Sequence, residues 1–147
     1  MALVAALSLP LVAAACDPDP APEAAGALAP AGEQVRTLVN EARAASGVAD
    51  LAENDVLQAR AQAWAEHLAA IGTLVHTPDL SVGLNFRWRV LGENIGFGST
   101  VSNVCDAFLK SPTHRGNVVD PRFTVIGVGV AVDGQGRTFV VEQFAAI

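Results

Sequence analysis

The C-terminal part of the chain has the pattern of a β-hairpin, and this pattern constrains the fold more than any other feature of the sequence. Residues 125–132 are mostly β-branched, interrupted by Gly127 and Gly129, which is typical of a strand. Asp133-Gly134-Gln135-Gly136 follows and supplies turn-forming residues before a second apolar run at 137–144. We therefore predict two antiparallel strands joined by a short turn.

Three stretches upstream of the hairpin have apolar residues at helical spacing, at 34–46, 54–71 and 101–110. Each is bounded by residues that cap or stop helices, namely Gly47 after the first, Asn54 and Gly72 around the second, and Thr100 and Pro112 around the third. Helices followed by a terminal hairpin predict an α+β fold.

The size and charge of the chain limit its class. A chain of 147 residues fits one domain with a core of its own. The net charge is −6, and the nine Lys and Arg residues are scattered rather than clustered. A nucleic-acid partner is therefore not expected, because such a partner needs a basic face.

The first residues predict export. Residues 1–15 form one apolar run, too short to cross a membrane and typical of a signal-peptide core. Small residues directly before Cys16 resemble the lipobox of bacterial lipoproteins, in which the cysteine becomes the lipidated first residue. We therefore expect a membrane-anchored protein of the cell envelope, facing the periplasm or the exterior. A soluble secreted protein cleaved elsewhere and an uncleaved leader are the alternatives.

Residues 16–33 are rich in proline and alanine, which predicts a tether between Cys16 and a folded domain at 34–147. The second cysteine, Cys105, falls in an apolar helical pattern, so a buried and inert thiol is expected. A bridge between the two cysteines is the alternative if the leader is cleaved elsewhere.

Three ionisable side chains lie beside turn-forming residues. Glu93 is in Gly92-Glu93-Asn94-Ile95, His114 is in Ser111-Pro112-Thr113-His114-Arg115-Gly116-Asn117, and His76 precedes a proline. Two histidines and a glutamate held in three loops are what a metal site or an acid–base pair requires. The three are therefore predicted to meet at the rim of a cleft.

Five segments in order resemble a bacterial CAP (SCP-like) domain, from the superfamily of cysteine-rich secretory proteins, antigen 5 and pathogenesis-related proteins. They are Leu38-Val39-Asn40-Glu41-Ala42-Arg43, His76, Gly92-Glu93-Asn94-Ile95, the segment 111–117, and Ile126-Gly127-Val128-Gly129. The resemblance covers residues 34–145. It implies a three-layer αβα sandwich with a central, mainly antiparallel sheet.

The resemblance also implies a cleft with two histidines and two acidic residues. By motif position His76 and His114 match the histidines and Glu93 matches one acidic residue. Ser111 stands where the second acidic residue is expected, and Glu142 on the last predicted strand is a possible substitute.

Two neutral imidazoles, His76 and His114, with the Glu93 carboxylate can bind a divalent metal such as Zn²⁺ and leave a position for water. The leading hypothesis is a non-enzymatic binding module for a small molecule, a lipid, an envelope component or a protein, since the resemblance implies such associations but no common reaction. One alternative is a metal-dependent hydrolase with Glu93 as general base. Another is a structural envelope protein. The missing fourth site residue favours a non-enzymatic role.

Overall fold

In the computed structural model, residues 23–147 are described. The predicted signal peptide at residues 1–15 and the predicted lipidation at Cys16 lie outside this part of the chain. The described elements run in the order α1 (Glu23–Ala45), β1 (Ala52–Glu53), α2 (Asp55–Ile71), β2 (Val90–Gly98), α3 (Val101–Lys110), α4 (Pro112–Val118), β3 (Val125–Val132) and β4 (Thr138–Ala146).

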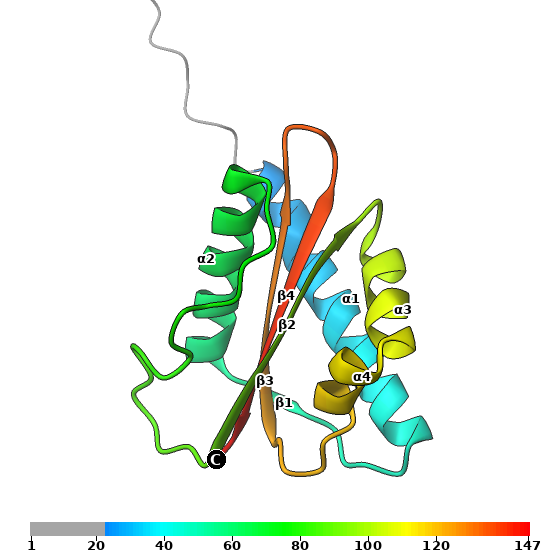
Figure 1. Cartoon of the computed structure of the whole chain (residues 1–147), viewed down its shortest axis with the longest axis vertical. Helices are drawn as coiled ribbons and strands as arrows, with labels where there is room; N and C mark the ends of the chain where they lie inside the picture. Colours follow the sequence, from blue (N-terminus) through cyan, green and yellow to red (C-terminus); the bar gives the residue numbers. More distant parts are fainter. Residues whose placement is uncertain (1–22) are drawn as a thin grey trace, which may run out of the picture.

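These elements form three layers, with α2 on one face of a sheet and α1, α3 and α4 on the other (Figure 1). The strand order is β1-β3-β4-β2. The short β1 pairs parallel with β3, whereas β3–β4 and β2–β4 are antiparallel. The predicted α+β sandwich with a mainly antiparallel central sheet is confirmed, and so is the C-terminal hairpin.

Local signals placed α2 and α3 correctly. The side chain of Asn54 caps α2 by accepting hydrogen bonds from the backbone N–H groups of Val56 and Leu57. Gly72 ends the helix with φ of 66°, a left-handed conformation that favours glycine. Thr100 caps α3 by accepting from the N–H of Asn103.

Helix α2 packs directly on the backbone of β3. A Cβ atom at Gly127 would overlap the backbone of Leu57, and one at Gly129 would overlap the backbone of Ala61. Both positions therefore require glycine for close approach rather than for a turn.

The short β1 covers only the first two residues of the outer edge of β3. Side chains of α2 cover the part of this edge that follows. Gln58 donates from Nε2 to the carbonyl of Val128 (2.6 Å) and accepts from its N–H (2.9 Å). Gln62 makes the same pair of hydrogen bonds with Val130, both at 3.0 Å. Two side-chain amides thus take the place of a neighbouring strand.

The predicted tether is corrected over residues 23–33. Helix α1 begins at Glu23 and contains Pro30, so this stretch is helical rather than extended. Its abundant alanine favours a helix, and Ala31 and Val35 pack into the core and hold the helix in place. Pro30 does not prevent this helix, because it removes a single backbone donor. Residues 16–22 lie outside the described part.

Two of the three predicted loops are also corrected. Residues 112–118 form α4, which starts directly after α3 because Pro112 at the first helical turn needs no N–H partner. Glu93 lies within β2. Only His76 is in a loop, between α2 and β2. Within residues 23–147, no helix has the length and apolar character needed to span a membrane.

Candidate functional site

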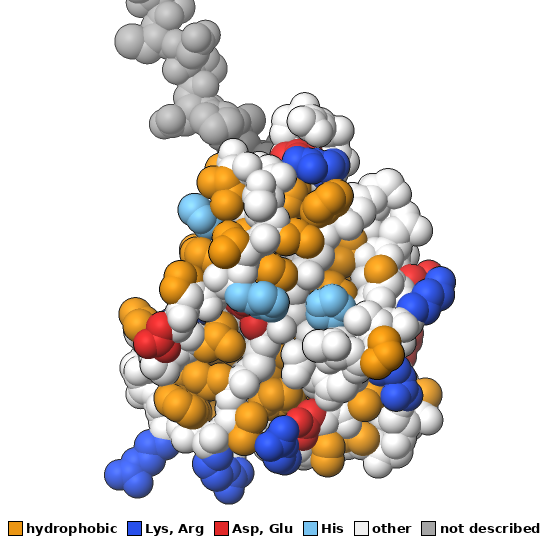
Figure 2. Space-filling view, viewed as in Figure 1, with side chains coloured by type: hydrophobic (Ala, Val, Ile, Leu, Met, Phe, Trp, Pro, Cys, Tyr) orange, Lys and Arg blue, Asp and Glu red, His pale blue; other side chains and the backbone are white. Residues whose placement is uncertain are grey.

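The candidate site surrounds β2, the outermost strand of the sheet on the side opposite β1. In Figure 1 this strand lies in front, between α2 and the α3–α4 pair. Figure 2 shows a groove on this face, with histidine side chains near its middle. We call it the β2 groove. Its floor is β2, and its walls are the loop at 73–77 and helix α4.

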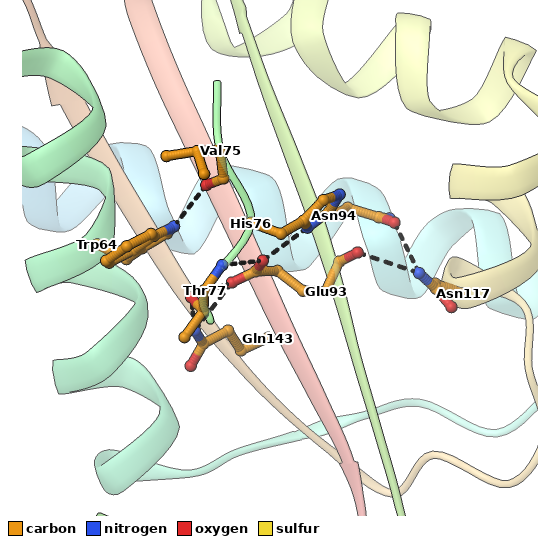
Figure 3. A network of polar contacts seen from close by, with 8 residues as sticks. All are labelled: Trp64, Val75, His76, Thr77, Glu93, Asn94, Asn117 and Gln143. Atoms are coloured by element: carbon orange, nitrogen blue, oxygen red, sulfur yellow. Dashed lines mark hydrogen bonds and ion pairs between the residues drawn. The ribbon is translucent and has the colours of Figure 1, made fainter. Parts of the chain in front are cut away.

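His76 and Glu93 meet on the α2 side of β2 (Figure 3). His76 Nδ1 lies 2.7 Å from Glu93 Oε1. The Glu93 side chain is only 2% exposed, whereas that of His76 is 63% exposed. The carboxylate is thus the buried support, and the imidazole is the part that solvent and ligands can reach.

The Glu93 carboxylate has further donors. The N–H of Thr77 donates to Oε1 at 3.0 Å, and the Thr77 hydroxyl donates to Oε2 at 2.5 Å. Gln143 Nε2 also donates to Oε2, at 3.1 Å. Each carboxylate oxygen therefore has two partners, which is the full capacity of an ionised carboxylate.

This arrangement determines what His76 and Glu93 can do. A saturated carboxylate accepts from Nδ1–H of His76, so the neutral ring keeps its lone pair on Nε2. Glu93 then orients the imidazole of His76 and leaves its Nε2 free of the carboxylate. The alternative role of general base does not fit, because no oxygen of Glu93 is left to face a water molecule.

His114 approaches from the other side of β2, on α4. Its ring packs against Phe108, with centroids 5.0 Å apart. Burial lowers the pKa of His114, and the charge of His76 lowers it further. The imidazole of His114 is therefore neutral at physiological pH, the form that binds metals.

A network of amides joins α4 to β2. Asn94 Nδ2 donates to the backbone carbonyl of His114 (3.1 Å) and to Glu142 Oε2 (2.9 Å). Asn117 Nδ2 donates to Asn94 Oδ1 (2.9 Å) and to the backbone carbonyl of Glu93 (3.2 Å). The network holds α4, which carries His114, against β2, and it accounts for both asparagines as scaffold residues. The segment that carries His76 is held separately, by the carboxylate of Glu93.

Glu142 does not replace the missing acidic residue beside His76. It pairs in register with Asn94, on the face of the sheet opposite Glu93. It is 1% exposed, and burial raises its pKa to about 7. Gln143, in register with Glu93, occupies the place beside that carboxylate. Ser111 serves as a helix cap, since its N–H donates to the carbonyls of Ala107 and Phe108.

Thr77 and Gln143 were not predicted from the sequence. Neither lies in a motif, and both reach Glu93 only through the fold. For Cys105 the prediction is confirmed: the thiol is free and buried, and burial raises its pKa to about 12. Within residues 23–147, no group of three or more His, Cys, Asp or Glu side chains is arranged to hold a metal ion.

Comparison with known proteins places these features in a family. Residues 36–144 match the model of the CAP family, described as the cysteine-rich secretory protein family. Uncharacterized protein YkwD of Bacillus subtilis (strain 168) is 28% identical over 110 residues, which are 69% of this chain and 43% of that protein. The chain therefore spans less than half the length of this curated relative.

Two solved structures show the same fold. An extracellular protein containing an SCP domain from Bacillus anthracis has a TM-score of 0.74 at 20% identity, covering 90% of this chain and 45% of that one. An outer surface protein of Borrelia burgdorferi has a TM-score of 0.67 at 19% identity, covering 79% of this chain and 92% of that one. With a family model that spans more than half of its residues, the chain belongs to the CAP, or cysteine-rich secretory protein, family.

Proposed function

We propose that this chain is an exported CAP domain whose β2 groove binds a ligand through His76 and His114, with a divalent metal such as Zn²⁺ held between the two imidazoles. The observation that supports the proposal is the contact of Glu93 with Nδ1 of His76. A carboxylate behind a histidine fixes its tautomer and makes the outer nitrogen a better metal ligand.

The donor set fits a weakly held metal ion. His76 Nε2 and the imidazole of His114 would be the two nitrogen ligands, and a ligand or water would complete the coordination. When bound, Zn²⁺ would supply a Lewis acid that attracts an anionic or carbonyl group of the ligand. Hydrolysis is not part of the proposal, because the oxygens of Glu93 are already paired.

Thermal unfolding with and without Zn²⁺ tests this proposal. A metal that binds only the folded state stabilises it by about 2.7 kcal/mol when its concentration is a hundred times Kd. We expect Zn²⁺ to raise the Tm near neutral pH, and the rise to fade towards about pH 5 as the imidazoles protonate.

The matched variants are His76→Ala, His114→Ala and His67→Ala. The first two should abolish the rise in Tm. His67, an exposed residue of α2 that packs against Trp64, is the control and should keep it. A wild-type protein with no rise, or a rise that survives loss of both His76 and His114, would show that the groove is not a metal site.

We further propose that Cys16 carries a lipid anchor and that the ligand is a lipid, an envelope component or another protein. The leader pattern before Cys16 supports the anchor, and the structural relatives are described as an extracellular and an outer surface protein. Wild-type protein should partition into a detergent phase, and Cys16→Ser should remain in the aqueous phase. Intact wild-type protein without a lipid adduct would indicate a soluble secreted protein instead.

A further inference from the structure

The two outer edges of the sheet differ in whether side chains pair with their backbone groups. Beyond β1, the edge of β3 is closed by Gln58 and Gln62, which pair with the backbone of Val128 and Val130. No comparable pair of side chains lies along β2 in the described part of the chain. An open strand edge invites pairing with another chain, and soluble proteins usually block it.

The register shows which groups of β2 point outward. Asn117, which lies on α4, donates to the carbonyl of Glu93, so the N–H and C=O of Glu93 face away from β4. In an antiparallel pair, alternate residues of a strand face the same edge. Leu91, Ile95 and Phe97 therefore also direct their backbone groups outward, into the β2 groove. Asn117 occupies one acceptor, the carbonyl of Glu93.

The surroundings of this edge differ along its length. Glu93 and Ile95 are each 7% exposed, so the middle of the edge is deep, whereas Phe97 is 45% exposed. Apolar side chains continue on the α2 side, where Ile71, Leu74 and Val75 are 47%, 39% and 44% exposed. Arg137 joins this wall to β2, since it lies 4.8 Å from the centre of the Phe97 ring and donates to the carbonyl of Gly72.

The opposite end of the strand is basic. Arg87 and Arg89 directly precede β2, and neither pairs with an Asp or Glu side chain among residues 23–147. Arg89 Nη2 donates to the carbonyl of Ile147 at 3.0 Å. Figure 2 shows Lys and Arg side chains along the lower end of this face. An extended chain antiparallel to β2 would bring its C-terminal end to these arginines, where acidic side chains are complementary.

We propose that the ligand of the β2 groove is an extended polypeptide segment of another protein, which adds as a strand to the outer edge of β2. It runs antiparallel to β2, with apolar side chains at alternate positions towards Ile71, Leu74 and Val75 and acidic residues at its C-terminal end. Main-chain hydrogen bonds supply the affinity and the alternate side chains supply the specificity. The proposal rests on the groove being the binding site but needs no metal.

The probe is a nine-residue peptide, matched to the length of β2, with the sequence acetyl-Thr-Val-Thr-Val-Thr-Val-Thr-Asp-Glu. Binding is followed by amide hydrogen exchange of the protein in the presence of EDTA, which separates this test from that of the metal. In free protein, the amides of Asn94 and Gly96, which pair with β4, should exchange slowly. The peptide should slow exchange at Ile95 and Phe97 by at least about tenfold, because new backbone hydrogen bonds protect these outward amides.

Two control peptides separate strand pairing from general adhesion. N-methylation of the valine amides removes the donors that face β2, so protection of Ile95 and Phe97 should disappear. Replacing Asp-Glu by Lys-Lys should weaken binding at low salt, because the basic residues would lie beside Arg87 and Arg89. Equal protection by the N-methylated peptide would overturn the proposal.

Two protein variants supply the matching test from the other side. Phe97→Pro removes an outward N–H that has no partner in β4, and Phe97→Ala removes the same ring but keeps that N–H. The proline variant should lose peptide binding and the alanine variant should keep most of it. If both bind equally, or if protection of Ile95 and Phe97 appears only through dimerisation of the protein, the peptide is not a strand on β2.

Discussion

At the scale of single residues, Glu93 and Glu142 are two buried carboxyl groups on paired strands that differ in their hydrogen-bond partners. Glu93 is buried, and its two carboxylate oxygens have four hydrogen-bond partners on His76, Thr77 and Gln143. Among residues 23–147, Glu142 has one side-chain donor, Asn94 Nδ2. It borders a small cavity whose other lining residues are Leu38, Val39, Cys105, Phe108, Leu109 and Val118. Burial therefore dominates at Glu142 and raises its pKa to about 7.

The raised pKa of Glu142 makes stability depend on pH. In the folded protein the group keeps its proton up to about pH 7, whereas in the unfolded chain it ionises near its ordinary value of 4.5. This contribution to stability is fully present below the unfolded pKa and is lost as pH rises through 7, a change of about 3 kcal/mol. A glutamine side chain cannot ionise, so the Glu142→Gln variant should not show this loss of stability as pH rises.

Urea unfolding of wild type and Glu142→Gln at about pH 4 and about pH 8 measures the difference. The variant should gain roughly 3 kcal/mol relative to wild type between the two conditions. A difference that stays constant with pH would show that Glu142 ionises normally in the folded protein.

At the scale of elements, the side-chain amides of α2 stabilise the sheet by substituting for a strand. Gln58→Ala removes both partners of the Val128 backbone groups, and each unpaired group in a partly buried place costs roughly 1–3 kcal/mol. Gln58→Ala should therefore lower the free energy of unfolding by at least about 2 kcal/mol, as measured in urea.

A glutamine on another helix provides the control. Gln34 in α1 is exposed and makes one hydrogen bond, to Ser102, so Gln34→Ala should change stability by less than about 0.5 kcal/mol. Equal effects of the two substitutions would mean that the amide of Gln58 contributes nothing at the edge of β3.

The elements also show what the sequence can predict. At the ends of α2 and α3, each capping residue has its hydrogen-bond partner within four residues, as Asn54 does with Val56 and Leu57. The local sequence was therefore sufficient to predict where these helices begin and end. The motifs singled out His76, Glu93 and His114, which lie in the loop before β2, in β2 and in α4. Thr77 and Gln143 escaped prediction because they meet Glu93 across 16 and 50 residues, the latter through the register of β2 with β4. No local pattern encodes that register.

At the scale of the whole molecule, one buried arginine joins α1 to the connection between α4 and β3. Arg43 is 1% exposed, and burial lowers its pKa against the opposing charges of Asp120 and Asp50. Its guanidinium donates to four backbone carbonyls that no helix or strand satisfies, those of Ala49, Val118, Asp120 and Phe123. This side chain fixes where α4, and with it His114, stands relative to the sheet.

Replacing Arg43 by methionine should therefore affect both stability and the β2 groove. Arg43→Met keeps much of the apolar stem but removes the guanidinium donors of all four carbonyls, although the carbonyl of Asp120 keeps the N–H of Phe123 as a partner. Hydrogen bonds from a charged group are each worth roughly 1.5–3 kcal/mol. We expect the free energy of unfolding to fall by at least about 3 kcal/mol, together with faster amide exchange in α4 under native conditions. The control is Arg36→Met, because Arg36 makes an ion pair at 3.5 Å with the half-exposed Glu53, and such pairs contribute about 0–1 kcal/mol. If Arg43→Met destabilises the protein but leaves exchange in α4 unchanged relative to the rest of the domain, then Arg43 supports the core without positioning His114.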